Sequence, residues 1–195
     1  MPSREPSWWY SGEASLAAHA LAPAAGIYAA IARRRLTRLP AYRSTLPVVC
    51  IGHFTAGGTG KTPLALFLAA ALHRLGVAPA FLTRGYGAAV ATPTLADPAR
   101  HTARDVGDEA LLLARAGPVM VSADRAAGAR AIEAMARPAD LILMDDGLQN
   151  PALNKDFSIA VIDGKRAFGN GLCIPAGPLR APLSFQAGLV QAIAI

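Results

Sequence analysis

The sequence predicts an α/β fold in which a mostly parallel sheet carries helices on both faces. From residue 46 onward, short and continuously apolar runs alternate with helical stretches, and buried parallel strands typically show such runs. The predicted strands are LPVVCI, APAFL, PVMVS, DLILM and FSIAVI, at 46–51, 78–82, 118–122, 140–144 and 157–162. The predicted helices cover 61–75, 108–116 and 125–136. Right-handed crossovers are the default for such alternation, so the helices cover both faces of the sheet.

Composition limits the class of protein but does not choose a partner. The chain has 195 residues, enough for one α/β domain with a buried core. It is 53% hydrophobic and 16% charged, which is too apolar for a disordered chain. The net charge of +6 suits nucleic acid, nucleotide phosphates or an anionic membrane surface. Cys50 and Cys173 form no CxxC pair and no cluster with histidine, which argues against a disulfide framework or a structural zinc site and fits a reducing compartment.

An uncharged N-terminal stretch, residues 14–32, precedes the strands and ends at a basic cluster. That cluster consists of Arg33, Arg34, Arg35 and Arg38. The stretch is close to the ~20 residues that a membrane-spanning helix needs, but it contains His19, Pro23 and Gly26 and is mostly alanine. Its transfer into a bilayer core is therefore only modestly favourable, and a spanning helix is not the favoured interpretation.

A helix that lies in the membrane interface fits the pattern better. Leu16, Ala20, Ile27 and Ile31 fall near one helical face. The neighbouring aromatic residues, 8–10, are of the type found at headgroup depth, and the arginines favour the cytoplasmic leaflet. The alternative is an ordinary N-terminal helix packed on the domain. We predict a membrane-associating region over 1–40 and a catalytic domain over 41–195.

The strongest motif lies directly after the first predicted strand and before the first predicted helix. The loop consists of Thr55, Ala56, Gly57, Gly58, Thr59, Gly60, Lys61 and Thr62. Its glycines let the backbone curl so that successive N–H groups point at a phosphate, and the helix adds the positive end of its dipole. Lys61 is expected to reach the β- and γ-phosphates, and the Thr62 hydroxyl to ligate Mg²⁺.

One position of this loop departs from the usual pattern, because Thr55 stands where the motif normally opens with glycine. A chance glycine-rich turn is the alternative interpretation. The order of strand, loop, GKT and helix favours a phosphate-binding loop, and with it a fold of the P-loop NTPase type.

A pair of carboxylates at the end of the strand DLILM complements the loop. Asp145 and Asp146 lie at the carboxyl edge of the predicted sheet, where ligands bind in α/β folds. In P-loop enzymes a strand-end aspartate holds Mg²⁺ directly or through water, and either residue suits this role. A simple turn at Asp146-Gly147 is the structural alternative.

A guanine-specifying segment would point to a switch GTPase instead. Asn154-Lys155-Asp156 resembles such an NKxD segment, but it lacks the spacer residue and follows the carboxylate pair too soon. We interpret it as a polar turn before the strand FSIAVI, and we expect ATP as the nucleotide.

Five motifs in order give the chain a specific resemblance. They are TAGGTGKTP at 55–63, TRGYG at 83–87, VGDEALLLA at 106–114, DDGLQNPAL at 145–153 and GNGLCIPAGPLRAP at 169–182. Together they resemble the tetraacyldisaccharide 4'-kinases, the lipid A 4'-kinases of Gram-negative bacteria, from about Ser7 to Ser184. The P-loop of that family begins with Ser or Thr, so Thr55 fits it. The last of the five segments is rich in glycine and proline and is expected to be an irregular loop.

The resemblance implies transfer of the ATP γ-phosphate to the 4'-hydroxyl of a tetraacylated glucosamine disaccharide 1-phosphate. Lys61 and Mg²⁺ would neutralise the triphosphate, with Thr62 and the Asp145/Asp146 pair as metal ligands. Asp108 matches the family's catalytic carboxylate and would accept the proton of the sugar hydroxyl, while Glu109 would bind metal or orient Asp108. Without the resemblance, two acids at a helix N-terminus are explained equally well by the helix dipole.

Further polar residues are candidates for substrate contacts. Arg84 and Arg125 carry the guanidinium forks that suit phosphates, with surface ion pairs as the alternative. Gln149 and Asn150 follow the carboxylate pair and can hydrogen-bond ligand or water. The expected partners are the acylated disaccharide lipid and an anionic membrane surface, without nucleic acid or an obligate protein partner. The expected location is the cytoplasmic face of the bacterial inner membrane.

The family is longer than this sequence, with a second lobe after the GPLR segment that supplies a histidine to pair with the catalytic aspartate. No histidine follows His101 here. We therefore expect a shortened kinase with weak transfer and an exposed apolar end, QAGLVQAIAI. Two other classes stay open: a nucleotide-binding module without catalysis, and a regulatory or metal-delivery NTPase. The latter needs a protein partner or a Cys/His cluster, and the sequence contains no such cluster.

Overall fold

The computed structural model describes residues 5–11, 15–38 and 42–195, which fall into two compact units. We call the part that comprises 42–52 and 61–158 the sheet unit, and the part that comprises the described residues up to 38 with 53–60 and 159–195 the flanking unit. The predicted boundary between 40 and 41 lies outside the described residues and stays a prediction.

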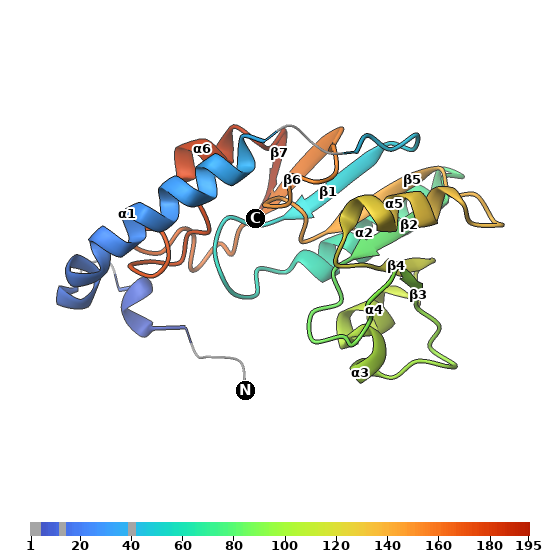
Figure 1. The fold of residues 1–195 in the computed structure, drawn as a ribbon, viewed down its shortest axis with the longest axis horizontal. Helices are drawn as coiled ribbons and strands as arrows, with labels where there is room; N and C mark the ends of the chain where they lie inside the picture. The colour runs from blue at the N-terminus through green and yellow to red at the C-terminus, as the bar shows by residue number, and fades with distance from the viewer. Residues whose placement is uncertain (1–4, 12–14, 39–41) are drawn as a thin grey trace. The chain divides into compact units, whose positions relative to one another are not determined.

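The sheet unit is built on five strands in the order β3-β4-β2-β5-β1 (Figure 1). Their bounds are β1 Val48–Gly52, β2 Pro79–Thr83, β3 Thr94–Leu95, β4 Val119–Val121 and β5 Leu141–Asp145. Neighbouring strands are parallel except β3, which pairs antiparallel with β4. The predicted α/β class is confirmed, and the four predicted strands of this unit lie within two residues of their expected bounds. The short antiparallel β3 was not predicted.

The helices of the sheet unit lie between its strands. They are α2 Lys61–Arg74, α3 Ala103–Val106, α4 Asp108–Leu113 and α5 Arg125–Glu133. α2 packs on β1, β2 and β5 and also contacts α4, whereas α5 packs on β2 and β4. Because β1 and β2 connect in one direction across the sheet and β4 and β5 in the other, right-handed crossovers place α2 and α4 on one face and α5 on the other. α4 and α5 both end three residues before their predicted ends, in turns that lead to Pro118 and Pro138.

The core is formed mainly by the central strands β2 and β5, which are buried along their whole length. Phe81, Leu82, Ile142, Leu143 and Met144 are each at most 1% exposed. A strand covered on both faces has no polar side to alternate with, which explains the continuous apolar runs of the sequence.

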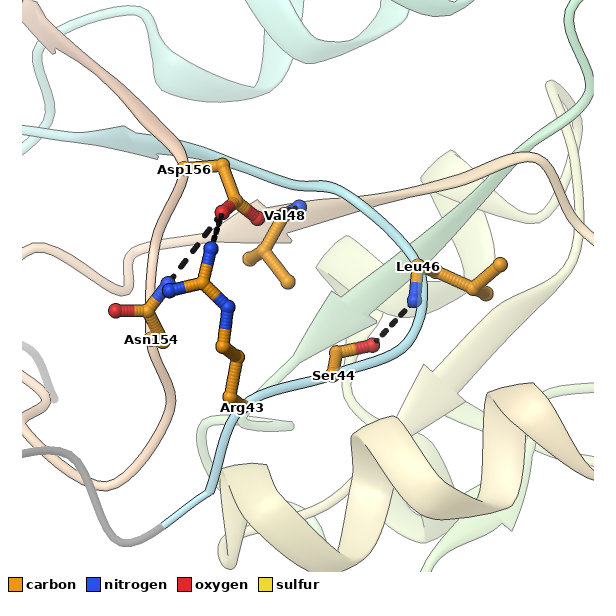
Figure 2. A network of polar contacts seen from close by, with 6 residues as sticks. All are labelled: Arg43, Ser44, Leu46, Val48, Asn154 and Asp156. Carbon is orange, nitrogen blue, oxygen red and sulfur yellow. Dashed lines mark hydrogen bonds and ion pairs between the residues drawn. The ribbon is translucent and has the colours of Figure 1, made fainter.

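A polar network fixes the start of β1 to the segment before β6 (Figure 2). The Asp156 carboxylate accepts hydrogen bonds from the Val48 N–H at 2.9 Å and from Asn154 Nδ2 at 3.4 Å, and it pairs with Arg43 at 3.2 Å. Lys155 donates to the Asn150 carbonyl at 2.5 Å, and burial lowers its pKa. All three residues of the Asn154–Asp156 segment therefore make structural contacts, as the polar-turn interpretation requires.

The flanking unit contains three helical segments and a pair of strands. Its helices are η1 Ser7–Trp9, α1 Leu16–Leu36 and α6 Leu183–Ala187, and β6 Phe157–Val161 pairs in parallel with β7 Ala192–Ala194 through residues 159–161. The helices α1 and α6 lie side by side (Figure 1). Arg33 of α1 stacks over the ring of Phe185 in α6, with 5.8 Å between the guanidinium carbon and the ring centroid. The segment 169–182, which lies between β6 and α6 in the sequence, contains no helix or extended strand, as predicted. The strand β7 was not predicted. Ile195, which directly follows β7, is 90% exposed.

The helix α1 has one buried and one exposed face. Ser15 caps its first turn, and Ala18 and Ala25 are buried. Leu16, Ile27 and Ile31 are 90%, 65% and 63% exposed, so the predicted apolar face of the helix is open to solvent. Of the helices in the described part of the chain, this one has the length and apolar composition to cross a membrane.

The aromatic cluster before α1 is divided between interior and surface. Trp9 is 8% exposed and its indole donates to the Pro175 carbonyl at 3.2 Å, while its own carbonyl accepts from Asn170 N–H. Trp8 and Tyr10 are half-buried. Trp9 therefore anchors the N-terminal segment to the 169–182 loop, and this ring is unavailable for the headgroup contacts expected of it.

Candidate functional site

The glycine-rich loop follows β1 and leads straight into α2 at Lys61. Gly57 and Gly60 have φ of 95° and 87°, in the left-handed region that favours glycine. Thr55 is not among the residues with positive φ; it forms an isolated bridge with Leu179, and the next N–H, of Ala56, donates to the Pro178 carbonyl at 2.7 Å. An extended, paired residue tolerates a side chain, which explains why threonine can replace glycine at the start of this loop.

The first turn of α2 brings a loop hydroxyl to an acid from another helix. Thr62 Oγ1 donates a 2.6 Å hydrogen bond to Oε1 of Glu109, which lies in the first turn of α4. Burial raises the pKa of Asp145, and Lys61 lies close enough for its charge to oppose this rise. Candidates from three distant motifs, separated by 47 and 84 residues along the chain, thus share one location in the sheet unit.

Asp145, the last residue of β5, is an acid with a strongly perturbed pKa. It is 1% exposed, and neither carboxylate oxygen has a hydrogen-bond partner among the described residues. Burial raises the pKa of Asp145 to about 7, helped by the negative charges of Glu109 and Asp146 and opposed by Lys61 and Arg125. A buried carboxylate without donors is costly unless a cation neutralises it.

Asp146 combines a turn with its place beside Asp145. Its φ is 49°, and its N–H continues the sheet by donating to the Ile51 carbonyl at 2.9 Å. Aspartate tolerates this left-handed conformation better than most residues do. The turn that we considered as the structural alternative is therefore present, and it leaves the side chain half-buried next to Asp145.

Asp108 begins α4 and is exposed to solvent, unlike the neighbouring Glu109, which is half-buried. Its Oδ1 accepts a 2.9 Å hydrogen bond from the Glu109 N–H. The helix follows Gly107, whose φ of 88° ends α3 and turns the chain into α4. An exposed carboxylate with one oxygen held by a backbone amide is accessible to an incoming hydroxyl group.

The two candidate arginines differ sharply in exposure. Arg84 follows β2 and is exposed, whereas Arg125 is 2% exposed. The guanidinium of Arg125 donates to the Ser122 carbonyl at 2.5 Å and to the Asp145 carbonyl at 3.5 Å. Burial lowers the pKa of Arg125 to about 10, the acids 145 and 146 oppose this, and Arg84 adds to it, so the two cations lie near each other. Arg125 stays charged at neutral pH and is bonded to the Asp145 backbone, whereas Arg84 is the solvent-exposed cation.

The amides after the carboxylate pair have mainly local roles in this structure. Asn150 Oδ1 accepts from the Ala152 N–H at 2.8 Å, which closes a short turn, and its carbonyl accepts from Lys155. Gln149 is half-buried in the same turn.

The donor set fits Mg²⁺ rather than a metal that prefers nitrogen or sulfur. The described residues contain no cluster of three or more His, Cys, Asp or Glu side chains suited to hold an ion by themselves. Mg²⁺ does not require one, because it is usually held by one or two carboxylates, waters and substrate phosphates. The donor-free carboxylate of Asp145 and the Thr62 hydroxyl are oxygen ligands of that kind.

One charged contact at the loop has no signal in the sequence. A carboxylate oxygen of Glu5 lies where the Cβ of any residue other than glycine would stand at position 57. Glu5 also pairs with Arg166, which is 161 residues away in sequence. A separation this long without a recognisable motif explains why the sequence singles out neither residue.

Comparisons by family model, by sequence and by structure all match tetraacyldisaccharide 4'-kinases. The family model described as LpxK, tetraacyldisaccharide-1-P 4'-kinase, matches residues 17–195. The protein from Methylobacterium radiotolerans named tetraacyldisaccharide 4'-kinase is 54% identical over 183 residues, which cover 94% of this chain and 55% of that protein. The protein of the same name from Dinoroseobacter shibae is 50% identical over 93% of this chain and 54% of its own length.

A solved structure shares the fold. The crystal structure of the "apo" form of LpxK from Aquifex aeolicus in complex with ATP matches with a TM-score of 0.77 and 26% identity, covering 90% of this chain and 57% of that one. The chain thus spans a little over half the length of the relatives it matches.

Proposed function

Because this chain belongs to the tetraacyldisaccharide-1-P 4'-kinase family, we propose that it binds Mg-ATP and carries the catalytic residues for phosphate transfer to a lipid disaccharide. The observation that carries the proposal is the meeting of Thr62, Glu109 and Asp145 at the end of the glycine-rich loop. The ATP in the Aquifex aeolicus structure and the names of the curated relatives support the nucleotide and the acceptor.

Nucleotide binding is assigned to the loop from Thr55 to Gly60 with Lys61 and Thr62. The left-handed glycines allow the backbone to wrap around a phosphate, and Lys61 at the start of α2 places a cation with the helix dipole. The triphosphate would be neutralised at one end by these groups. Arg84 is the exposed cation available to the transferring phosphate or to the phosphate of the acceptor.

Mg²⁺ would be held by Thr62 and Asp145, with Asp146 and Glu109 as neighbouring carboxylates. When bound, the ion neutralises charge on the β- and γ-phosphates. The Glu109 carboxylate accepts a hydrogen bond from the Thr62 hydroxyl group. The lone pairs of the Thr62 oxygen therefore remain available for a cation. Arg125 donates a hydrogen bond to the Asp145 carbonyl and so helps to fix the end of β5.

The transfer itself needs little covalent participation from the protein. The 4'-hydroxyl oxygen of the acceptor forms a bond to the γ-phosphorus, the bond from that phosphorus to the bridging oxygen breaks, and ADP leaves with the electron pair. Asp108 accepts the hydroxyl proton, a role that its exposed carboxylate at the start of α4 allows. Lys61 stabilises the charge that develops on the leaving phosphate.

The helix α1 supports attachment to a membrane surface, which would bring the enzyme to its lipid substrate. The exposed Leu16, Ile27 and Ile31 form an apolar face, and the arginines at the end of the helix suit anionic lipids. We place the protein on the cytoplasmic face of the inner membrane, where ATP is available. Residues 1–40 are the membrane-associating region of this proposal and 41–195 its kinase domain.

The experiment measures phosphate transfer to the tetraacyldisaccharide 1-phosphate in mixed micelles. Because the curated relatives extend beyond the matched segment, the protein used is this chain fused to the portion of the Methylobacterium radiotolerans relative that follows the match. Asp108→Ala should lower kcat by about 10²–10⁴-fold, the usual contribution of a general base, with ATP affinity unchanged. Asp105→Asn, a matched change on the neighbouring α3, should keep the rate. Near-normal turnover of Asp108→Ala would remove this residue from the mechanism, and binding of ATP without transfer by any fusion would favour a nucleotide-binding module.

A further inference from the structure

The segment before α1 contacts the glycine-rich loop through Glu5. At Gly57 a Cβ atom would overlap Oε1 of Glu5 and would stand 3.3 Å from Oε2. The side chain of Glu5 is only 21% exposed. A negatively charged group therefore lies in contact with a loop whose backbone conformation is suited to bind anions.

Three neighbours hold this carboxylate in place within the flanking unit. Arg166 Nη1 donates to Glu5 Oε2 at 3.0 Å, and the Arg166 guanidinium lies 5.1 Å from the centroid of the Tyr10 ring. Burial, with a hydrogen bond to Glu5, raises the pKa of Tyr10 to about 12, so its hydroxyl stays a neutral donor. The buried ring of Trp9 fixes the segment between Glu5 and Tyr10 to the 169–182 loop.

The Glu5 carboxylate would repel a triphosphate that occupied the same loop. Like charges about 4 Å apart repel each other in water, and more strongly in a partly buried place. Arg166 is still 52% exposed and is long enough to exchange one anionic partner for another. A phosphate that enters the loop would therefore compete with the Glu5 carboxylate for the same guanidinium.

We propose that Glu5 is an internal competitor for the phosphate site. Its carboxylate lies against Gly57 in the nucleotide-free protein, moves away when the triphosphate binds, and leaves Arg166 to pair with a phosphate. Glu5 lowers the affinity for ATP, and Arg166 is an additional phosphate-binding residue. The inference rests on the proposed binding of ATP by this loop.

The test is isothermal calorimetry of Mg-ATP binding to the 195-residue chain. Glu5→Gln keeps the size of the side chain and removes its charge, and it should tighten ATP binding by about threefold to tenfold. The matched control is Asp156→Asn, which removes the carboxylate of the ion pair with Arg43 and should leave the affinity unchanged. Equal or weaker binding by Glu5→Gln would overturn the competition. Absence of ATP binding in the wild type and in both variants would instead contradict the proposed function.

A second variant tests Arg166. Added to Glu5→Gln, Arg166→Ala should remove most of the gained affinity, because the phosphate then loses the cation released to it. Full retention of the gain would exclude Arg166 as a phosphate ligand.

Hydrogen exchange on the unmodified chain gives an independent measurement that needs no variant. Mg-ATP should accelerate exchange of the amides in 5–11, since the carboxylate that ties this segment to the loop is displaced. Slower exchange there on ATP addition would mean that the segment closes over the nucleotide, which contradicts the proposal.

Discussion

At the scale of single residues, Asp145 combines deep burial with a lack of hydrogen-bond donors. β5 carries this residue into a buried place where described residues donate no hydrogen bond to its carboxylate, and the negative neighbours Glu109 and Asp146 make ionisation more costly still. The protein spends stability to hold an ionisable oxygen pair next to Thr62 and Lys61. Such a cost is expected at a functional site and unexpected at a purely structural one.

This cost gives a pH-dependent prediction for stability. The folded pKa of Asp145 is about 7, against about 3.9 in an unfolded chain, so the folded state holds a proton that the unfolded state has released. The stabilisation from that proton is complete below about pH 4 and is lost as the pH rises to about 7. In the presence of chelator, Asp145→Asn should therefore exceed the wild type in unfolding free energy at pH 8 by on the order of 2 kcal/mol, and the gap should close towards pH 4.

Thermal denaturation across pH 4–8 measures this difference, with Asp140→Asn as the control at the start of the same strand. Mg-ATP should raise the wild-type Tm at pH 8 more than that of Asp145→Asn. A difference in Tm between wild type and variant that does not change with pH would contradict the assignment.

Among the site residues, those in motifs could be predicted and those outside them could not. The Lys61-Thr62 pair and the strand-end acids follow from short patterns whose chemistry dictates residue type and spacing. The burial of Arg125 could not be foreseen, because a guanidinium after a strand suits a surface phosphate equally well. Glu5 and Arg166 come together only through the docking of Trp9, a tertiary contact without local signal.

At the scale of elements, α1 carries the clearest division of roles. One face, with Ala18 and Ala25, packs within the flanking unit, and the other exposes large aliphatic side chains. Periodicity predicted this division, since 16, 20, 27 and 31 fall on one side of a helix. Small buried residues and large exposed ones reverse the usual preference, which favours a second apolar phase as the partner of the exposed face.

A single charge on that face should weaken membrane binding. Ile27 is 65% exposed, and its transfer to a bilayer is worth roughly 1.5–3 kcal/mol, so Ile27→Asp should lower partition onto anionic liposomes by at least about tenfold. The control is Leu75→Asp, which changes a 78% exposed leucine outside α1 and should float with the liposomes as the wild type does. Equal flotation of Ile27→Asp would move the attachment site away from this helix.

The two strands that were not predicted share one property, which is shortness. β3 has two residues and β7 has three, too few to show either alternation or a continuous apolar run. Both are edge additions to longer strands, and pairing with β4 and β6 rather than local sequence decides their conformation. Long buried strands such as β2 and β5 carry their signal in every residue, which is why their places were predictable.

At the scale of the whole molecule, the chain forms two compact units and spans 54–58% of the length of its curated relatives. The Aquifex aeolicus structure matches it over 90% of its length, so the fold of this part does not depend on close sequence similarity. We therefore expect this chain to bind Mg-ATP, and the proposed transfer step is measured with the fusion protein described above.

Calorimetric titration of the 195-residue chain with Mg-ATP tests that claim most directly. We expect one nucleotide to bind, and only with Mg²⁺ present. Lys61→Ala should lose this binding with an unchanged circular dichroism spectrum, and the exposed control Lys165→Ala should keep it. The same affinity for ATP in Lys61→Ala as in the wild type would contradict nucleotide binding by the glycine-rich loop.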